Sequence, residues 1–407
     1  MSGVVPAVVV TGLGAVTPVG ATAGETWSAL LAGHSGIALL EESWAQELPV
    51  RMAGRVSLDL TSALTTPEIK RMDRPAQLAL IAAREAWAQS GRPEMDPERL
   101  AVVIGSGYGG LDTAVAQTRT LDGSGSRRVS PHTLTRIMVN APSAWVSIDV
   151  GARGGARTPV SACASGAEAI AQAADMIRLG AADVVIAGGV DSCVNGLTIS
   201  GFSQIRALST RNQEPQAASR PFDRDRDGFV MAEGAGIMVL ESEEHARARG
   251  AKILGIIAGS AVMSDAVDIV AADPAIQRRV MQKALAAADL TGQDVGFVHA
   301  HATSTPVGDR LEAHAINAVV GNQVQVTSTK SLTGHLLGGA GALGAIVTLQ
   351  ALRSGSIPGT RNIENLDPEI GLNIVTETTH GVARAAGMAN AFGFGGHSTS
   401  LVITAAS

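Results

Sequence analysis

The chain has 407 residues, of which 45% are hydrophobic and only 3% aromatic, and its formal net charge is −6. This length exceeds the size at which one core usually stops growing, so two domains or two fused halves are expected. The charged residues form no basic stripe, which argues against a nucleic-acid partner. No run reaches ~18 unbroken apolar residues and the uncharged N-terminal segment lacks a basic region, so neither a membrane span nor a signal peptide is predicted.

Buried strands are predicted by short, mostly β-branched runs flanked by Gly, Ser or Thr, at 8–10, 100–104, 184–187, 237–240 and 295–298. Ala-rich helical patterns lie between them, for example at 76–89, 166–179 and 278–288. The alternation predicts an α/β fold with mixed or largely parallel sheets.

Two segments repeat the order strand, polar turn, small-residue helix. In the first, residues 158–160 lead into a turn that carries Cys163. In the second, residues 324–327 lead into a turn that carries Lys330 and His335. We infer a duplicated α/β unit, with residues 1–250 as the N-terminal half and 251–407 as the C-terminal half. No low-complexity linker separates the halves, so they are expected to pack as one body.

The two cysteines, Cys163 and Cys193, can form at most one disulfide, and a chain of this size needs none. This usage favours a reducing, cytoplasmic location with a free thiol. Cys163 lies between a strand and a helix, where the helix dipole and free backbone N–H groups favour a thiolate. From the cysteine alone, a small buried apolar side chain is the better interpretation, and the small-residue turn around it makes a nucleophile equally good.

The segment HAHATSTPVGD at 299–309 follows a predicted strand, so its two His side chains share a face while the chain stays extended. If the halves pack pseudo-symmetrically, Lys330 and His335 face the Cys163 turn. A cysteine with two histidines at the junction of two halves predicts a nucleophilic or acyl-transfer site. The alternative for His335 is that it only caps its helix.

Three other patterns are weaker. A zinc site at the histidines would need further ligands, and His314 and Glu312 lie in a helical stretch, so no metal is expected. The GSGYGG segment at 105–110 fits a dinucleotide-binding pattern but lacks the acidic residue about 20 positions further on. The charged segment DRDRDG at 223–228 begins like a calcium loop, but Glu233 is one position early for the closing ligand, which favours a charged turn.

Seven motifs together resemble the β-ketoacyl-acyl-carrier-protein synthases: VSACASG at 160–166, ALSTRN at 207–212, RPFD at 220–223, DGFV at 227–230, HATSTP at 301–306, KSLTGH at 330–335 and FGFGG at 392–396. The resemblance covers nearly the whole chain. It is nearest to the elongating type II enzymes of fatty acid synthesis (synthase II), several motifs being similar to actinobacterial versions, and to their type II polyketide relatives.

The resemblance implies a thiolase-like fold, in which duplicated αβαβα halves form a five-layer sandwich, and usually a dimer. It implies that an acyl group moves from the phosphopantetheine of an acyl carrier protein to Cys163. Malonyl-carrier then loses CO₂ and attacks the acyl-enzyme, giving a 3-oxoacyl-carrier two carbons longer. Neutral His301 and His335 can donate N–H bonds to the malonyl thioester oxygen. Since the phosphopantetheine arrives on the carrier, no cofactor of the protein's own is expected.

The resemblance also implies roles for single residues. The backbone N–H groups of Cys163 and Phe394 form the oxyanion hole, and Phe394 gates the acyl pocket. Lys330 tunes the electrostatics near His335. Substrate binding falls to Thr303 and Thr305 for the pantetheine arm, to Phe202 and Tyr108 for the acyl chain, and to Phe392. The candidate docking residues for an acidic carrier are Arg206, Arg127 and Arg128.

Two departures from the family pattern stand out. The family usually has a Glu on the helix after His335, paired with the lysine, but the matching residue here is Gly344. Tyr108 stands where an aliphatic residue is common, which predicts a shortened or redirected acyl pocket; packing at a dimer seam is the alternative.

Several functional alternatives stay open on the sequence. The chain could be the ketosynthase of a type II polyketide system, paired with a chain-length partner, or a non-condensing partner subunit. A thiolase using coenzyme A would need a second cysteine as base, and Cys193 is in no matching motif. Acyl length, and homodimer against heterodimer, are not determined.

Overall fold

The computed structural model describes residues 6–381 and 386–406. The strands are β1 (Val8–Val16), β2 (Ile37–Leu39), β3 (Met52–Gly54), β4 (Leu100–Gly105), β5 (Ala156–Arg157), β6 (Val184–Asp191), β7 (Gly234–Ser242), β8 (Gly255–Ser264), β9 (Val295–His299), β10 (Gln325–Thr327), β11 (Ser356–Ile357), β12 (Asn373–Ile374), β13 (Thr379–His380), β14 (Ala386–Gly393) and β15 (His397–Ala405).

The α-helices are α1 (Ala23–Ala32), α2 (Thr66–Arg71), α3 (Arg74–Gln89), α4 (Leu111–Ser124), α5 (Thr133–Ile137), α6 (Ala141–Val150), α7 (Ser165–Arg178), α8 (Gly196–Gln204), α9 (Pro215–Ala218), α10 (Glu243–Ala248), α11 (Pro274–Ala287), α12 (Gly308–Val320), α13 (Lys330–Thr333) and α14 (Ala340–Ser354). Short 3₁₀ turns include η4 (Ser126–Arg128), η5 (Ala162–Ala164) and η7 (Leu337–Gly339). Among the described residues, no helix is both long and apolar enough to cross a membrane.

The strand order repeats within the chain. The first part of the main sheet runs β5-β4-β6-β7-β1 and the second runs β10-β9-β14-β15-β8, with β12 added at the outer edge. The parallel and antiparallel pairings also correspond strand for strand. The two parts meet where β1 pairs with β8, through Val9 opposite Ile256 and Val10 opposite Gly255. The predicted duplication is therefore confirmed, while the boundary at residue 250 stays a prediction.

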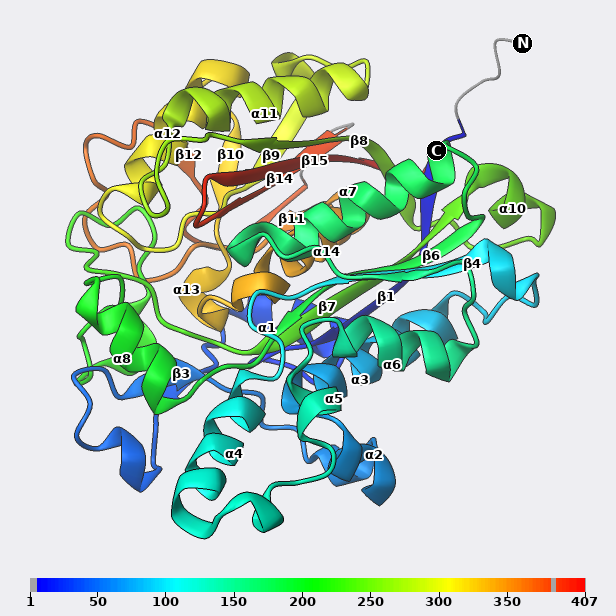
Figure 1. The fold of residues 1–407 in the computed structure, drawn as a ribbon. Helices are drawn as coiled ribbons and strands as arrows, with labels where there is room; N and C mark the ends of the chain where they lie inside the picture. Colours follow the sequence, from blue (N-terminus) through cyan, green and yellow to red (C-terminus); the bar gives the residue numbers. More distant parts are fainter. Residues whose placement is uncertain (1–5, 382–385, 407) are drawn as a thin grey trace.

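Helices and sheets alternate in five layers (Figure 1). α3 and α6 cover the outer face of the first sheet part, α11 and α12 cover that of the second, and α7 and α14 lie between the two. The two central helices are built from small residues because they approach each other and the sheets closely. A Cβ on Gly341 of α14, for example, would lie 2.8 Å from the backbone nitrogen of Ala167 in α7.

The predicted α/β architecture, the predicted helices and the five strands predicted from β-branched runs occur in the structure. The strand predicted at residues 158–160 is wrong, because β5 ends at Arg157 and the chain then runs without regular structure into the Cys163 turn. Three long strands of the second half, β8, β14 and β15, carry no sequence signal that we used. β14 has the sequence AGMANAFG, in which small residues replace the β-branched ones typical of a buried strand. Its neighbours explain the composition, since α14 packs directly on it.

Candidate active site

Cys163 lies in a tight turn between β5 and α7. Ala162, just before it, has a φ of 48°, a left-handed conformation that is unusual for a residue with a Cβ. Ser165 holds the turn closed, because its Oγ accepts from the backbone nitrogen of Ser161 at 2.9 Å and donates to the carbonyl of Ala162 at 2.7 Å. The cysteine is half-buried and unpaired, as a nucleophile requires.

The end of β14 approaches this turn at Gly393. A Cβ on Gly393 would lie 2.4 Å from the carbonyl oxygen of Ser161 and 3.1 Å from the backbone nitrogen of Cys163. Only glycine allows this approach, which brings the next residue, Phe394, beside the nucleophile. The ring of Phe394 is 38% exposed and lies 6.4 Å from that of Phe202.

His301 and His335 come from the second half and lie edge to face, with ring centroids 5.3 Å apart. His335 is joined to the first half by its backbone: its nitrogen donates to the carbonyl of Val230 at 2.8 Å, and its carbonyl accepts from Ala232 at 2.9 Å. Among the described residues, neither ring nitrogen of His335 has a hydrogen-bond partner. The alternative that this side chain only caps a helix is therefore wrong, and both nitrogens are free to meet a substrate.

Two buried carboxylates of α12 hold the loop that carries His301. Glu312 accepts from the backbone nitrogens of His301 at 2.8 Å and Ala302 at 2.6 Å. Asp309 accepts from Ser304 at 3.1 Å and Thr305 at 3.3 Å. The sequence did not reveal these roles, which fix the backbone between the histidine and the two predicted pantetheine-binding threonines.

Asp191, at the end of β6, organises the other side of the site. Its fully buried carboxylate accepts from Ser106 Oγ at 2.8 Å and from the backbone nitrogens of Gly107, Tyr108 and Gly338 at 3.0, 3.1 and 2.7 Å. The glycine-rich segment 105–110 thus binds a carboxylate of its own chain. One residue ties the loop after β4 to the turn that follows His335.

The site is electrically neutral at its reacting atoms. Burial raises the pKa of the Cys163 thiol to about 12, with the Asp191 carboxylate acting in the same direction and Lys330 opposing it. Burial also holds the pKa values of His301 and His335 well below their usual range, helped by the charge of Lys330. The resting protein therefore has a thiol and two neutral imidazoles, so the expected thiolate does not form before substrate binds.

Lys330 is 4% exposed, and burial lowers its pKa. No described carboxylate lies within ion-pairing distance of it. The space beside Gly344, where the family usually has a Glu, is taken by His299. A Cβ on Gly344 would lie 2.9 Å from His299 Nδ1, and His299 Nε2 hydrogen-bonds with Thr329 Oγ1 at 3.0 Å. Burial lowers the pKa of His299 to about 3, so a neutral imidazole stands in that place.

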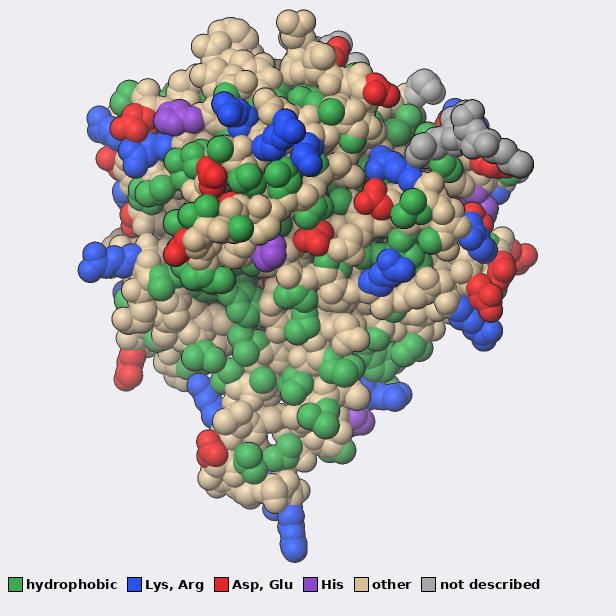
Figure 2. All heavy atoms as spheres, turned by 45° about the horizontal axis from the view of Figure 1, so that its top comes forward, with side chains coloured by type: hydrophobic (Ala, Val, Ile, Leu, Met, Phe, Trp, Pro, Cys, Tyr) green, Lys and Arg blue, Asp and Glu red, His purple; other side chains and the backbone are tan. Residues whose placement is uncertain are grey.

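A cavity of about 600 Å³ opens at Cys163. It brings together most of the residues predicted from the sequence: Cys163, His301, His335, Thr303, Thr305, Tyr108, Phe202, Phe392, Phe394 and Arg206. Lys330 is buried outside the lining. Arg127 and Arg128 are exposed in η4, beyond α4, and do not line the cavity either. Charged side chains of both signs are scattered over the face seen in Figure 2, without a single-sign stripe.

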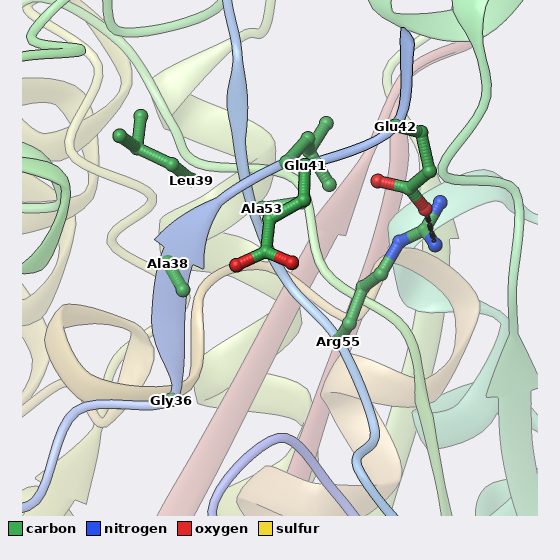
Figure 3. Close-up of a pocket in the computed structure, with 8 residues that line it drawn as sticks. Gly36, Ala38, Leu39, Glu41, Glu42, Ala53 and Arg55 are labelled. Atoms are coloured by element: carbon green, nitrogen blue, oxygen red, sulfur yellow. Dashed lines mark hydrogen bonds and ion pairs between the residues drawn. The ribbon is translucent and has the colours of Figure 1, made fainter.

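A second hollow, of about 440 Å³, lies at the β2–β3 hairpin (Figure 3). Its one arginine, Arg55, pairs with Glu42 and donates to the carbonyl of Val194 at 2.9 Å. No cysteine or histidine lines it, and one of its two glutamates, Glu42, is paired with Arg55, so it lacks the thiol and imidazoles of the first cavity. Within residues 6–381 and 386–406, no group of three or more His, Cys, Asp or Glu side chains could hold a metal ion.

The duplicated fold, with a thiol from one half and two histidines from the other, places the protein in the class of condensing acyltransferases with a thiolase-like architecture. Comparison with known proteins makes the assignment specific. Residues 6–246 match the model of the β-ketoacyl synthase N-terminal domain, and residues 254–364 match that of the C-terminal domain. The chain belongs to the β-ketoacyl synthase family.

Individual relatives agree. The chain is 43% identical over 403 residues to 3-oxoacyl-[acyl-carrier-protein] synthase 2 of Mycobacterium tuberculosis, covering 97% of this chain and 96% of the relative. The enzyme of the same name from Synechocystis is 40% identical over 402 residues, covering 97% of each chain.

Solved structures share the fold. A β-ketoacyl synthase from Burkholderia phymatum superposes with a TM-score of 0.92 at 32% identity, covering 99% of this chain and 100% of the other. A type II polyketide ketosynthase, solved with its acyl-carrier protein and bound to the hexaketide, gives 0.91 at 28% identity with the same coverage. The predicted fold and family are therefore confirmed.

Proposed function

We propose that the protein catalyses the decarboxylative Claisen condensation of an acyl group, held as a thioester on Cys163, with malonyl-acyl-carrier protein. The products are 3-oxoacyl-acyl-carrier protein and CO₂, and the pathway is fatty acid chain elongation. The observation that carries this proposal is the meeting of the Cys163 turn with His301 and the unpartnered ring of His335 in one cavity. Relatives named 3-oxoacyl-[acyl-carrier-protein] synthase 2 support it.

In the first step, the sulfur of Cys163 attacks the carbonyl of the incoming thioester. Because the thiol is neutral, it must lose its proton as the bond forms, and neutral His335 can relay that proton to the departing pantetheine sulfur. The carbonyl oxygen becomes negative and takes N–H bonds from the backbone at Cys163 and Phe394. Removing one such donor typically costs roughly 3 to 4 kcal/mol of barrier stabilisation.

In the second step, malonyl-carrier occupies the vacated space. Loss of CO₂ leaves an enolate, and the two imidazole N–H groups stabilise the thioester oxygen where its charge collects. The enolate carbon attacks the acyl-Cys163 carbonyl, and the tetrahedral intermediate expels the Cys163 sulfur, which takes up one proton. The 3-oxoacyl chain leaves on the carrier. Low histidine pKa values are compatible with this step, because a neutral imidazole still has one N–H to donate to the thioester oxygen.

Substrate and partner roles follow from position. Thr303 and Thr305, with hydroxyl oxygens 3.2 Å apart, would bind the pantetheine arm, and Phe392 would line the same space. Tyr108 and Phe202, with rings 6.4 Å apart, would bound the acyl pocket. Exposed Arg206 lies at the cavity and would meet the acidic carrier, with Arg127 and Arg128 as secondary contacts. Lys330 would tune His301 and His335 electrostatically, without a Glu partner on α14.

We further propose a cytoplasmic homodimer that needs no cofactor beyond the phosphopantetheine of its carrier. The second candidate function is the ketosynthase subunit of a type II polyketide synthase. It is favoured by the likeness to the hexaketide-bound ketosynthase and to a solved ketosynthase/chain length factor, the latter with a TM-score of 0.90 at 29% identity. In that case, the protein would act as a heterodimer with such a partner.

Intact-protein mass spectrometry tests the proposal. The protein is incubated with acyl-carrier and then with malonyl-carrier, beside Cys163→Ala and the control Cys193→Ala, whose cysteine is fully buried away from the cavity lining. We expect an acyl adduct on the wild type and the control but not on Cys163→Ala. Addition of malonyl-carrier should then remove the adduct and give a product two carbons longer. No adduct from any primer would overturn the proposal, and product made only with a partner subunit would favour the polyketide candidate.

A further inference from the structure

Gln277 has a buried side-chain amide that the mechanism above does not use. It is 3% exposed, and its Oε1 has no hydrogen-bond partner among the described residues. No described residue hydrogen-bonds with the other side-chain atom either, yet the residue lines the cavity that opens at Cys163. Because burying an unpaired amide is unfavourable, such a group in a binding cavity points to a polar ligand.

The position of Gln277 in the fold indicates which part of the cavity it serves. It lies in the first turn of α11, which packs beside α12 on the outer face of the second sheet part. The strands before these helices, β8 and β9, run in the same direction within the sheet. The N-termini of α11 and α12 therefore lie at the same end of the strands as the loop of Thr303 and Thr305. Tyr108 and Phe202, in contrast, come from the first half.

The neighbour of Gln277 on the same helical face supports this placement. Met281 lies one turn further along α11, and its sulfur is 3.3 Å from Nδ2 of Asn390. That same nitrogen lies 3.3 Å from Oε1 of Glu312, the carboxylate that holds the His301 backbone. The face of α11 that carries Gln277 therefore looks toward the catalytic loop and not toward bulk solvent.

We infer that Gln277 binds an amide of the pantetheine arm and so positions the thioester, an inference that rests on the proposed function. The arm contains two secondary amides between its phosphate and its sulfur. A glutamine side chain offers one acceptor and two donors, which complement the N–H and C=O of a secondary amide. An unsubstituted acyl chain has no group that could pair with it.

The test compares Gln277→Met, which keeps the length and removes the amide, with wild type in the acylation of Cys163. Two donors carry the same acyl group: acyl-pantetheine, with both amides, and the acyl thioester of 2-mercaptoethanol, with none. We expect kcat/KM to fall about tenfold with acyl-pantetheine, as one lost hydrogen bond predicts, and to stay within about twofold with the short donor. Gln204→Met, at the exposed end of α8, is the matched control and should change neither rate.

Two results would overturn the inference. Equal losses with both donors would mean that Gln277 acts on the fold or on the acyl group and not on the arm, and no loss with either would mean that it contacts no ligand. Failure of wild type to be acylated by any donor would instead count against the proposed function, so the two failures are distinguishable.

Discussion

Replacing Gly344 by alanine tests whether this glycine makes room for His299. The added Cβ would lie 2.9 Å from Nδ1 and 3.2 Å from Cε1 of the imidazole, which is 2% exposed and bonded to Thr329 on its other side. Overpacking of this kind costs about 1–3 kcal/mol. Alanine for a mid-helix glycine returns roughly 0.5–1 kcal/mol. The crowding is the larger effect, so we expect a net loss of about 1–2 kcal/mol in the free energy of unfolding.

Urea unfolding followed by tryptophan fluorescence measures this loss. Gly201→Ala is the matched control, because Gly201 is also helical but a Cβ there would meet nothing within 4 Å. That variant should gain stability while Gly344→Ala loses it. In a His299→Ala background the cost at position 344 should disappear, since the crowded atoms are gone. A Gly344→Ala variant as stable as the control, or a cost that persists without the imidazole, would refute the reasoning.

Three further outcomes are expected. Gly393→Ala should lower kcat/KM for Cys163 acylation at least about 100-fold, because its Cβ would push the Cys163 turn away from the Phe394 N–H; an unchanged rate would contradict that geometry. Asp191→Asn points an NH₂ group at backbone N–H donors and should destabilise the protein by about 2–4 kcal/mol in thermal unfolding, whereas equal stability would mean that the bonds from Gly107 and Gly338 matter little. Because burial raises the pKa of Cys163 to about 12, the thiol stays protonated below that pH and the thiolate fraction grows about tenfold per pH unit. Iodoacetamide should therefore alkylate the free enzyme faster with each unit between about pH 6 and pH 9. A plateau of the alkylation rate in that range would show a much lower pKa.

Local patterns predicted much of the fold. Strands such as β4 and β6 are runs of β-branched residues, and helices such as α3 are Ala-rich, so short windows reveal them. β14 was not predicted, because its small residues are explained by the packing of α14 on it, and that contact is not visible in a short window of sequence. The pairing of β1 with β8 was not predicted for a similar reason, since it joins residues about 250 positions apart in the chain through only two residue pairs.

The candidate site divides in the same way. Residues inside short motifs, such as Cys163, His301 and His335, were found because chemistry and spacing mark them directly. Asp191 and Glu312 were not found, because their work is to accept backbone N–H groups from distant loops. Their only signal was an acidic residue at the end of a buried run or on the inner face of a helix. Gly344 was noticed as a missing Glu, but the imidazole that fills its place became visible only in three dimensions.

The repeated strand order has a consequence for how this chemistry is inherited. The turn before α7 and the turn before α14 occupy equivalent places in the two halves, yet one keeps the sulfur and the other keeps a lysine and a histidine. In a symmetric pair of identical subunits, every substitution would appear twice and such a division would be impossible. When the two halves are fused into one chain, each half can lose a catalytic residue that the other half keeps. Mutational tolerance should therefore differ at equivalent positions, although the two backbones trace the same path.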